Sequence, residues 1–190
     1  MLGIPICKGE KMPIYEYEGK RPRIGSTSYV HPTAVLIGEV TIGEGCWIGP
    51  HVTMRADEGS ITMGDFSNIQ DNSVIHGRNV ILGRYSHLGH SCTLHGVTLG
   101  EHVLVAINAV VLDGVEVGDW CTIAAGAVVA PGAKIPPRKM LMGVPAAIVG
   151  DVPPGRERDF DWTHSTGYLI RPKKYLEGLK EISLEEATVS

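Results

Sequence analysis

The chain contains eight histidines, and three of them, His76, His90 and His95, lie within one short stretch of the sequence. Neutral imidazole is the most common protein ligand for transition metals. Three such nitrogens that leave a fourth position open form the usual arrangement of a catalytic zinc site. These three histidines therefore predict a metal site that could activate water at neutral pH.

Polar side chains that could assist such a site lie on either side of these histidines. A carboxylate can hold or carry a proton, and an amide can orient a reacting water molecule. The polar residues concerned are Arg55, Asp57, Glu58, Gln70, Asp71 and Asn108.

The elements that must position these residues follow from a repeat of six residues. An aliphatic residue recurs at every sixth position, with three residues inserted after Met54, one inserted after Ile75 and one deleted after Leu94. The 19 positions are Val30, Leu36, Ile42, Ile48, Met54, Met63, Ile69, Ile75, Leu82, Leu88, Leu94, Leu99, Val105, Val111, Val117, Ile123, Val129, Ile135 and Leu141.

A period of six excludes an amphipathic helix, whose apolar residues recur at spacings of three and four. It fits one short strand and one turn, and three such units close a triangular coil of 18 residues. Stacked coils pair strand on strand at about 4.8 Å, so the fold is all-β, a parallel β-helix. Cys46, Cys92 and Cys121 take the small-residue position of the repeat and are expected to fill the core.

The repeat also predicts where the histidines lie. Units three apart lie above one another, so Arg55, His76 and His95 should form a vertical ladder on one face. His90 belongs to the adjoining face, where Gln70 and Asp71 lie below it and Asn108 lies one coil above.

A single chain would struggle to bring His90 to the same ion as His76 and His95. Packing the triangular coil against two copies solves this, because one face of a subunit then meets the next face of its neighbour. The sequence therefore predicts a homotrimer whose metal sites lie at the subunit interfaces.

The repeat region also sets the expected boundaries. Residues 1–28 hold no repeat unit and should form an N-terminal strand or cap, and residues 29–146 form the β-helix. Residues 147–190 form a linker and a C-terminal α-helix, which the alternation of apolar and charged residues places between Lys173 and Ala187.

Composition excludes several classes of protein. The net charge of −4 gives no bias toward nucleic acid or anionic membranes. No apolar run is long enough to span a bilayer, and no signal segment is present, so we expect a cytoplasmic protein without a membrane partner. The four cysteines have no paired spacing, which argues against a disulfide framework.

The sequence resembles those of a known family, the γ-class carbonic anhydrases. The resemblance spans roughly residues 13–150, and its motifs are MRADEG (54–59), NIQD (68–71), VIH (74–76) and LGHSCTLHG (88–96). Within that family the chain is most similar to the bacterial branch found in phenylacetate-degradation and carnitine operons, through HPTAVLIGEV (31–40), INAVVLDG (107–114) and GVPA (143–146).

The resemblance implies that the β-helix is left-handed and that His76, His90 and His95 bind a metal across a trimer interface. It also implies an intersubunit ion pair between Arg55 and Asp57. The remaining roles that it implies are Gln70 and Asp71 beside the metal-bound water and Glu58 as proton donor or acceptor.

The expected activity is reversible, metal-dependent hydration of CO₂ to bicarbonate with Zn²⁺, or with Fe²⁺ or Co²⁺, which three-histidine sites also accept. The segment between His76 and His90 contains Arg78 and Arg84 and no carboxylate, whereas active family members carry an acidic loop there. Slow turnover is therefore expected. Three alternatives stay open: a metal-dependent thioesterase acting on acyl-CoA, a CoA-dependent acyltransferase, and a non-catalytic assembly subunit.

Overall fold

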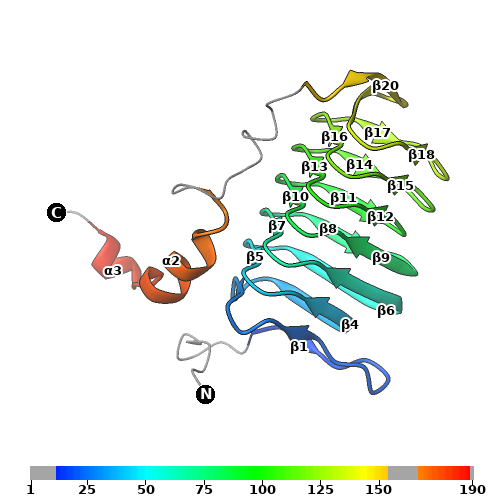
Figure 1. Cartoon of the computed structure of the whole chain (residues 1–190). Coiled ribbons are helices and arrows are strands. Elements are labelled where there is room, and N and C mark those ends of the chain that lie inside the picture. Colours follow the sequence, from blue (N-terminus) through cyan, green and yellow to red (C-terminus); the bar gives the residue numbers. More distant parts are fainter. Residues whose placement is uncertain (1–11, 154–166, 189–190) are drawn as a thin grey trace.

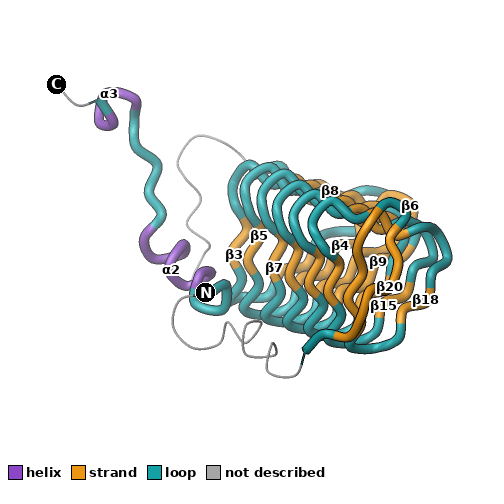
Figure 2. The backbone as a smooth tube through the Cα atoms, turned by 90° about the horizontal axis from the view of Figure 1, so that it is seen from above, coloured by secondary structure: helices purple, strands orange, loops and turns teal. Residues whose placement is uncertain are grey.

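The computed structural model describes residues 12–153 and 167–188, and within them the chain forms a left-handed parallel β-helix (Figure 1). Seen from above, the coils stack in register as a triangular prism with three faces (Figure 2). The predicted fold class is therefore confirmed.

The first face carries short strands joined by parallel pairing. It starts with β1 (Ile14–Tyr15) and the first parts of β4 (Val35–Ile42) and β6 (Thr53–Met63). It continues through β8 (Val74–His76), β11 (Thr93–His95), β14 (Val110–Val111) and β17 (Val128–Val129).

The second face holds the later parts of β4 and β6, because both strands continue around a corner of the prism. Its other strands are β2 (Arg23–Ile24), β9 (Asn79–Leu82), β12 (Thr98–Leu99), β15 (Glu116–Val117) and β18 (Lys134–Ile135).

The third face is a separate eight-stranded sheet. It contains β3 (Tyr29–Val30), β5 (Trp47–Ile48), β7 (Asn68–Ile69), β10 (His87–Leu88), β13 (Leu104–Val105), β16 (Thr122–Ile123), β19 (Lys139–Gly143) and β20 (Ala146–Asp151). The last strand, β20, pairs antiparallel with β19.

Register follows the predicted repeat. Tyr29 pairs with Trp47, which is 18 residues further along, whereas Arg55 pairs with His76 across the three-residue insertion. Of the predicted aliphatic positions, all are buried except Ile135, which is partly buried. The three core cysteines are buried as well, and burial raises the pKa of Cys46 and Cys92 to about 11, so their thiols stay protonated.

The C-terminal helix differs from the prediction, because two helices replace the single one expected from Lys173 to Ala187. They are α2 (Arg171–Gly178) and α3 (Leu184–Ala187). The backbone becomes extended at Leu179, directly after Gly178, a poor helix former. Ser183 precedes α3 and forms a capping box with Glu186, in which the backbone N–H of each residue donates a hydrogen bond to the side-chain oxygen of the other.

Helix α2 contacts the coil at β3. Strands β1 and β2 lie within residues 1–28, the expected N-terminal strand or cap, and both pair with β4, while residues 1–11 lie outside the described part of the chain. Neither helix among the described residues has the length and apolar character needed to cross a bilayer.

Candidate metal centre

The predicted ladder on the first face is confirmed. Arg55 of β6 pairs in register with His76 of β8, and His76 pairs in register with His95 of β11. All three side chains point outward, because each follows an aliphatic residue that points into the core.

The two histidine rings face one another. Nδ1 of His76 lies 3.0 Å from Nε2 of His95, and the ring centroids are 5.0 Å apart. The opposite nitrogen of each ring faces a carboxylate: Nε2 of His76 is 3.0 Å from Asp57, and Nδ1 of His95 is 2.7 Å from Asp113.

For two neutral rings, these contacts assign the position of each proton. A neutral imidazole carries one N–H, and a carboxylate can only accept, so each ring donates its proton to its carboxylate. The two nitrogens that face one another then both present lone pairs. Lone pairs at this distance repel, and a proton or a metal ion between them would remove the repulsion.

Asp57 therefore serves His76 as well as Arg55. Its other oxygen accepts a hydrogen bond from Arg55, two residues earlier on the same side of β6. Desolvation alone would raise the pKa of Asp57, but the hydrogen bonds from Arg55 and His76 outweigh it and lower that pKa. The ion pair that the resemblance implies between subunits thus forms within one chain, because alternate strand residues share a face.

Glu58 lies apart from this cluster. The pairing of β4 with β6 shifts after Gly38, so residues 57–59 bulge out of the ladder, and Glu58 at their centre is exposed. Gly59 is required in this bulge, since a Cβ there would lie 1.3 Å from the carbonyl oxygen of Arg78. The proton-carrying role of Glu58 stays a prediction.

His90 lies on the corner after β10, as the repeat predicts. Its Nδ1 is 2.9 Å from the carboxylate of Asp71 in the coil below, a contact that leaves the lone pair of a neutral ring at Nε2. The backbone N–H of Asn108, one coil above, donates to the carbonyl of His90, while the Asn108 side chain is exposed.

Within the described residues of one chain, no three His, Cys, Asp or Glu side chains come together as a metal site. His76 and His95 share one face, and His90 projects from the next. The donors nevertheless fit a metal ion. In a tetrahedral zinc site two nitrogen ligands are about 3.3 Å apart, close to the 3.0 Å between the histidine rings.

Gln70 lies next to Asp71 and belongs to a buried polar chain. Its amide donates to the side-chain oxygen of Asn68 at 3.3 Å, and the Asn68 amide donates to Nδ1 of His87. Burial, with a smaller contribution from His102, lowers the pKa of His87 to about 4, so this ring is neutral at pH 7.

Several residues around the site are absent from the sequence-based prediction. Asp113 could have been found, because the repeat places it one coil above Gly96, beside His95. Trp47 and Tyr168 could not, because their contact depends on how the C-terminal segment folds back. Burial, opposed by Arg171 and reinforced by Asp71, raises the pKa of Tyr168.

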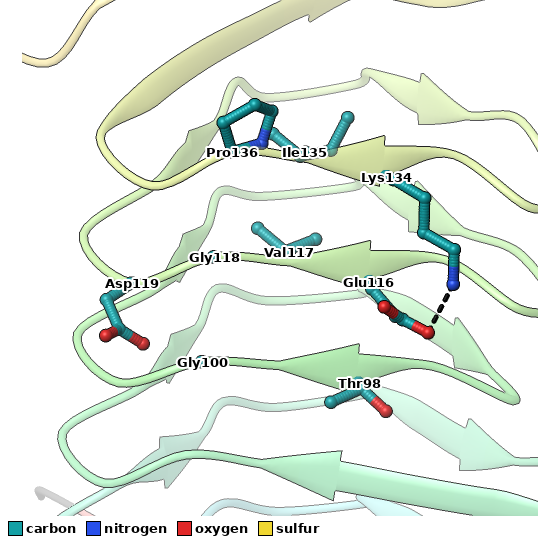
Figure 3. A pocket seen from close by; sticks show the side chains of 9 residues that line it. All are labelled: Thr98, Gly100, Glu116, Val117, Gly118, Asp119, Lys134, Ile135 and Pro136. Carbon is teal, nitrogen blue, oxygen red and sulfur yellow. Dashed lines mark hydrogen bonds and ion pairs between the residues drawn. The ribbon is translucent and has the colours of Figure 1, made fainter.

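A groove of about 440 Å³ lies on the second face (Figure 3). It includes Thr98, Asp119 and Pro136, and an ion pair joins Lys134 to Glu116 across it. The groove contains none of the residues predicted for catalysis or metal binding.

The stacked coils, their parallel register and the turns between the short strands are those of a hexapeptide-repeat protein of the β-helix class. The family model described as "Bacterial transferase hexapeptide (six repeats)" matches residues 96–137. The chain is 40% identical over 180 residues to the carnitine operon protein CaiE of Escherichia coli (strain K12 / DH10B), covering 92% of this chain and 88% of the relative. It therefore belongs to the same family of hexapeptide-repeat proteins as CaiE.

Solved structures agree with this assignment. A Bacillus cereus protein assigned to the acetyltransferases superposes with a TM-score of 0.82 at 28% identity, over 86% of this chain and 96% of that one. A hexapeptide transferase family protein from Anaplasma phagocytophilum superposes with a TM-score of 0.82 at 27% identity, over 86% of this chain and 98% of that protein. A place among the γ-class carbonic anhydrases is compatible with these likenesses and stays a prediction.

Proposed function

We propose that the protein is a metal-dependent hydrolase of acyl-CoA thioesters, with Zn²⁺ as the expected metal and Fe²⁺ or Co²⁺ as possible replacements. His76 and His95 of one subunit and His90 of the next would bind the ion in a homotrimer. The observation that carries the proposal is the 3.0 Å separation of His76 Nδ1 and His95 Nε2, with the other nitrogen of each ring beside a carboxylate.

The carboxylates favour a metal over a shared proton. Metal-bound histidines usually donate their second N–H to a carboxylate, which fixes the tautomer and the ring orientation. All three predicted ligands have such a partner: Asp57 for His76, Asp71 for His90 and Asp113 for His95. A shared proton would need only two of these histidines and would leave the third pair without a function.

The substrate class rests on the relatives. Those with the highest structural similarity reported above are described as an acetyltransferase and a hexapeptide transferase, and acyl transfer in such enzymes starts from a thioester. Replacing the acceptor alcohol or amine by water turns transfer into hydrolysis. The absence of a carboxylate between His76 and His90 also disfavours CO₂ hydration, which requires rapid proton export.

Each residue near the site then has a defined task. A bound divalent ion supplies Lewis acidity and activates water at neutral pH. Asp57, Asp71 and Asp113 hold the N–H of each histidine, which keeps the opposite nitrogen available. Gln70, anchored through Asn68, orients the attacking water, and Arg55 keeps Asp57 ionised. The cytoplasmic location expected from the sequence is part of this proposal.

Thiol release from a panel of acyl-CoA thioesters tests the proposal on protein of known metal content. We expect hydrolysis to rise in proportion to bound zinc and to be lost in His95→Ala. His51→Ala is the matched control, since His51 is an exposed histidine with no place in the site. Zinc-loaded protein that releases no more thiol than His95→Ala would refute the thioesterase.

Two other activities would be revealed by the same samples. Hydration of CO₂ is the second candidate, favoured by the Arg55–Asp57–His76 contacts that the resemblance predicts in part, and stopped-flow assays would detect it. An acyltransferase would release thiol only when an alcohol or amine acceptor is added. An assembly subunit would show neither activity.

Subunit mixing tests whether the site is shared. Chains with His90→Ala retain His76 and His95, and chains with His76→Ala retain His90. Random mixing in a trimer should restore about one site in four, because an intact site needs one chain of each kind in the correct order. Mixed trimers that bind no zinc would show that the site is not shared between subunits.

A further inference from the structure

We infer that Trp47 is a positioning residue for the third metal ligand, and that the C-terminal segment holds Trp47 in place. Trp47 would act through Asp71, whose carboxylate holds His90. The inference rests on the proposed metal site but concerns residues that neither the sequence pattern nor the relatives assign.

The side chains of Trp47 and Asp71 both approach Gly49. A Cβ added at Gly49 would lie 2.6 Å from Oδ1 of Asp71 and 2.8 Å from the six-membered ring of Trp47. The carboxylate and the ring thus both border the space above this glycine. Asp71 thus directs Oδ2 to His90 and Oδ1 toward the space that the Trp47 ring also borders.

Trp47 itself is held firmly. It is only 3% exposed and lies among aromatic rings of the C-terminal segment, with centroid separations of 5.5 Å to both Tyr168 and Tyr175. Arg171 at the start of α2 lies over the Trp47 ring at 5.5 Å and over the Tyr168 ring at 4.0 Å. Tyr29 completes the cluster from the coil below.

The position of the Trp47 ring matters because the neighbouring His90–Asp71 pair is open to solvent. The side chains of His90 and Asp71 are 44% and 34% exposed, and ion pairs or hydrogen bonds at such positions are weak and poorly fixed. An apolar ring on one side limits the directions in which the carboxylate can turn and keeps water from that side. The segment around α2 therefore fixes a metal ligand without touching the metal.

The geometry also explains why position 49 is glycine. An alanine methyl group would collide with two side chains, of which the Asp71 carboxylate is the easier to displace, because Trp47 is packed on several sides. Gly49→Ala should therefore push Asp71 away from His90 and leave the coil intact.

Zinc affinity, measured on the full-length oligomer by competition with a chromophoric chelator, tests the inference. Trp47→Leu should weaken binding roughly tenfold, the usual effect of losing a supporting residue, and Trp47→Phe should restore most of it. Trp120→Leu is the matched control, because Trp120 stacks on His102 at a different corner of the coil. Equal zinc affinity in Trp47→Leu and Trp120→Leu would overturn the inference.

Two further measurements separate positioning from general destabilisation. In an Asp71→Asn background, Trp47→Leu should cause no additional loss of affinity; a full additional loss would mean that Trp47 does not act through Asp71. In metal-free protein, ¹⁵N NMR should show the Nδ1–H form of His90 in the wild type and its loss in Gly49→Ala. Wild-type protein that binds no zinc would refute the proposed metal site, and ¹⁵N NMR of Trp47→Leu beside Gly49→Ala would still decide whether Trp47 and Gly49 position Asp71.

Discussion

Acidification should destabilise the protein through His87, and the size of this effect follows from its burial. The ring is 4% exposed on the third face, where it accepts a hydrogen bond from Asn68. In the unfolded chain a histidine takes up a proton near pH 6.5, whereas the folded protein resists protonation of His87 until about pH 4. Between these values the unfolded state binds more protons, so the free energy of unfolding falls as the pH decreases.

The magnitude can be worked out directly. A pKa lowered from 6.5 to about 4 corresponds to about 3 kcal/mol at full effect, since each unit is worth about 1.4 kcal/mol. Between pH 7 and pH 5 the expected loss is about 2 kcal/mol, because the proton uptake of the unfolded chain is then nearly complete. Carboxylates also contribute to acid sensitivity, so the comparison requires a variant that lacks only this titration.

His87→Gln provides that variant, because glutamine can accept the Asn68 hydrogen bond and does not titrate. Urea unfolding at pH 7, 6 and 5 and at constant protein concentration would give the free energies. From pH 7 to pH 5, the free energy of unfolding of the wild type should fall by about 2 kcal/mol more than that of the variant. Parallel pH dependences for the two proteins would refute the assignment of a neutral, buried His87.

Three further predictions concern the core, the bulge and the ladder. Leu94→Ala removes a fully buried side chain and should lower the free energy of unfolding by about 3 kcal/mol, measured in urea; a change below 1 kcal/mol would contradict close packing. Gly59→Ala should cost about 3 kcal/mol through its clash with the next coil, whereas Gly150→Ala, with open space around it, should leave Tm unchanged. Asp113→Asn should weaken zinc binding roughly tenfold at unchanged Tm, and unaltered affinity would exclude Asp113 as a partner of the metal-binding histidine.

The fold could be predicted in detail because the repeat has an integral period. Every insertion adds residues without adding a strand, so the position of His95 above His76 follows by counting, and the structure confirms it. The same counting places His90 above Asp71 on the next face. Local periodicity thus determines which side chains share a face, even when they are 19 residues apart in sequence.

The remaining features depend on contacts that periodicity does not encode. Trp47 meets Tyr168 only because the C-terminal segment returns to the coil after residues that carry no repeat. The break between α2 and α3 was accessible from the sequence, since Ser183 and Glu186 have the spacing of a capping box. The activity is the feature that the sequence pattern determines least, because structures with the same β-helix are described as transferases, whereas the motifs resemble those of carbonic anhydrases.

The antiparallel strand β20 also limits how these molecules can associate. A stack of parallel coils could grow without end if the top of one molecule offered the hydrogen-bonding pattern that the bottom of another requires. Because β20 runs against β19, a second molecule whose own coil continues the parallel pattern would meet an edge of opposite direction. On the third face, the final strand thus makes continuation of the parallel pairing by a second molecule unfavourable.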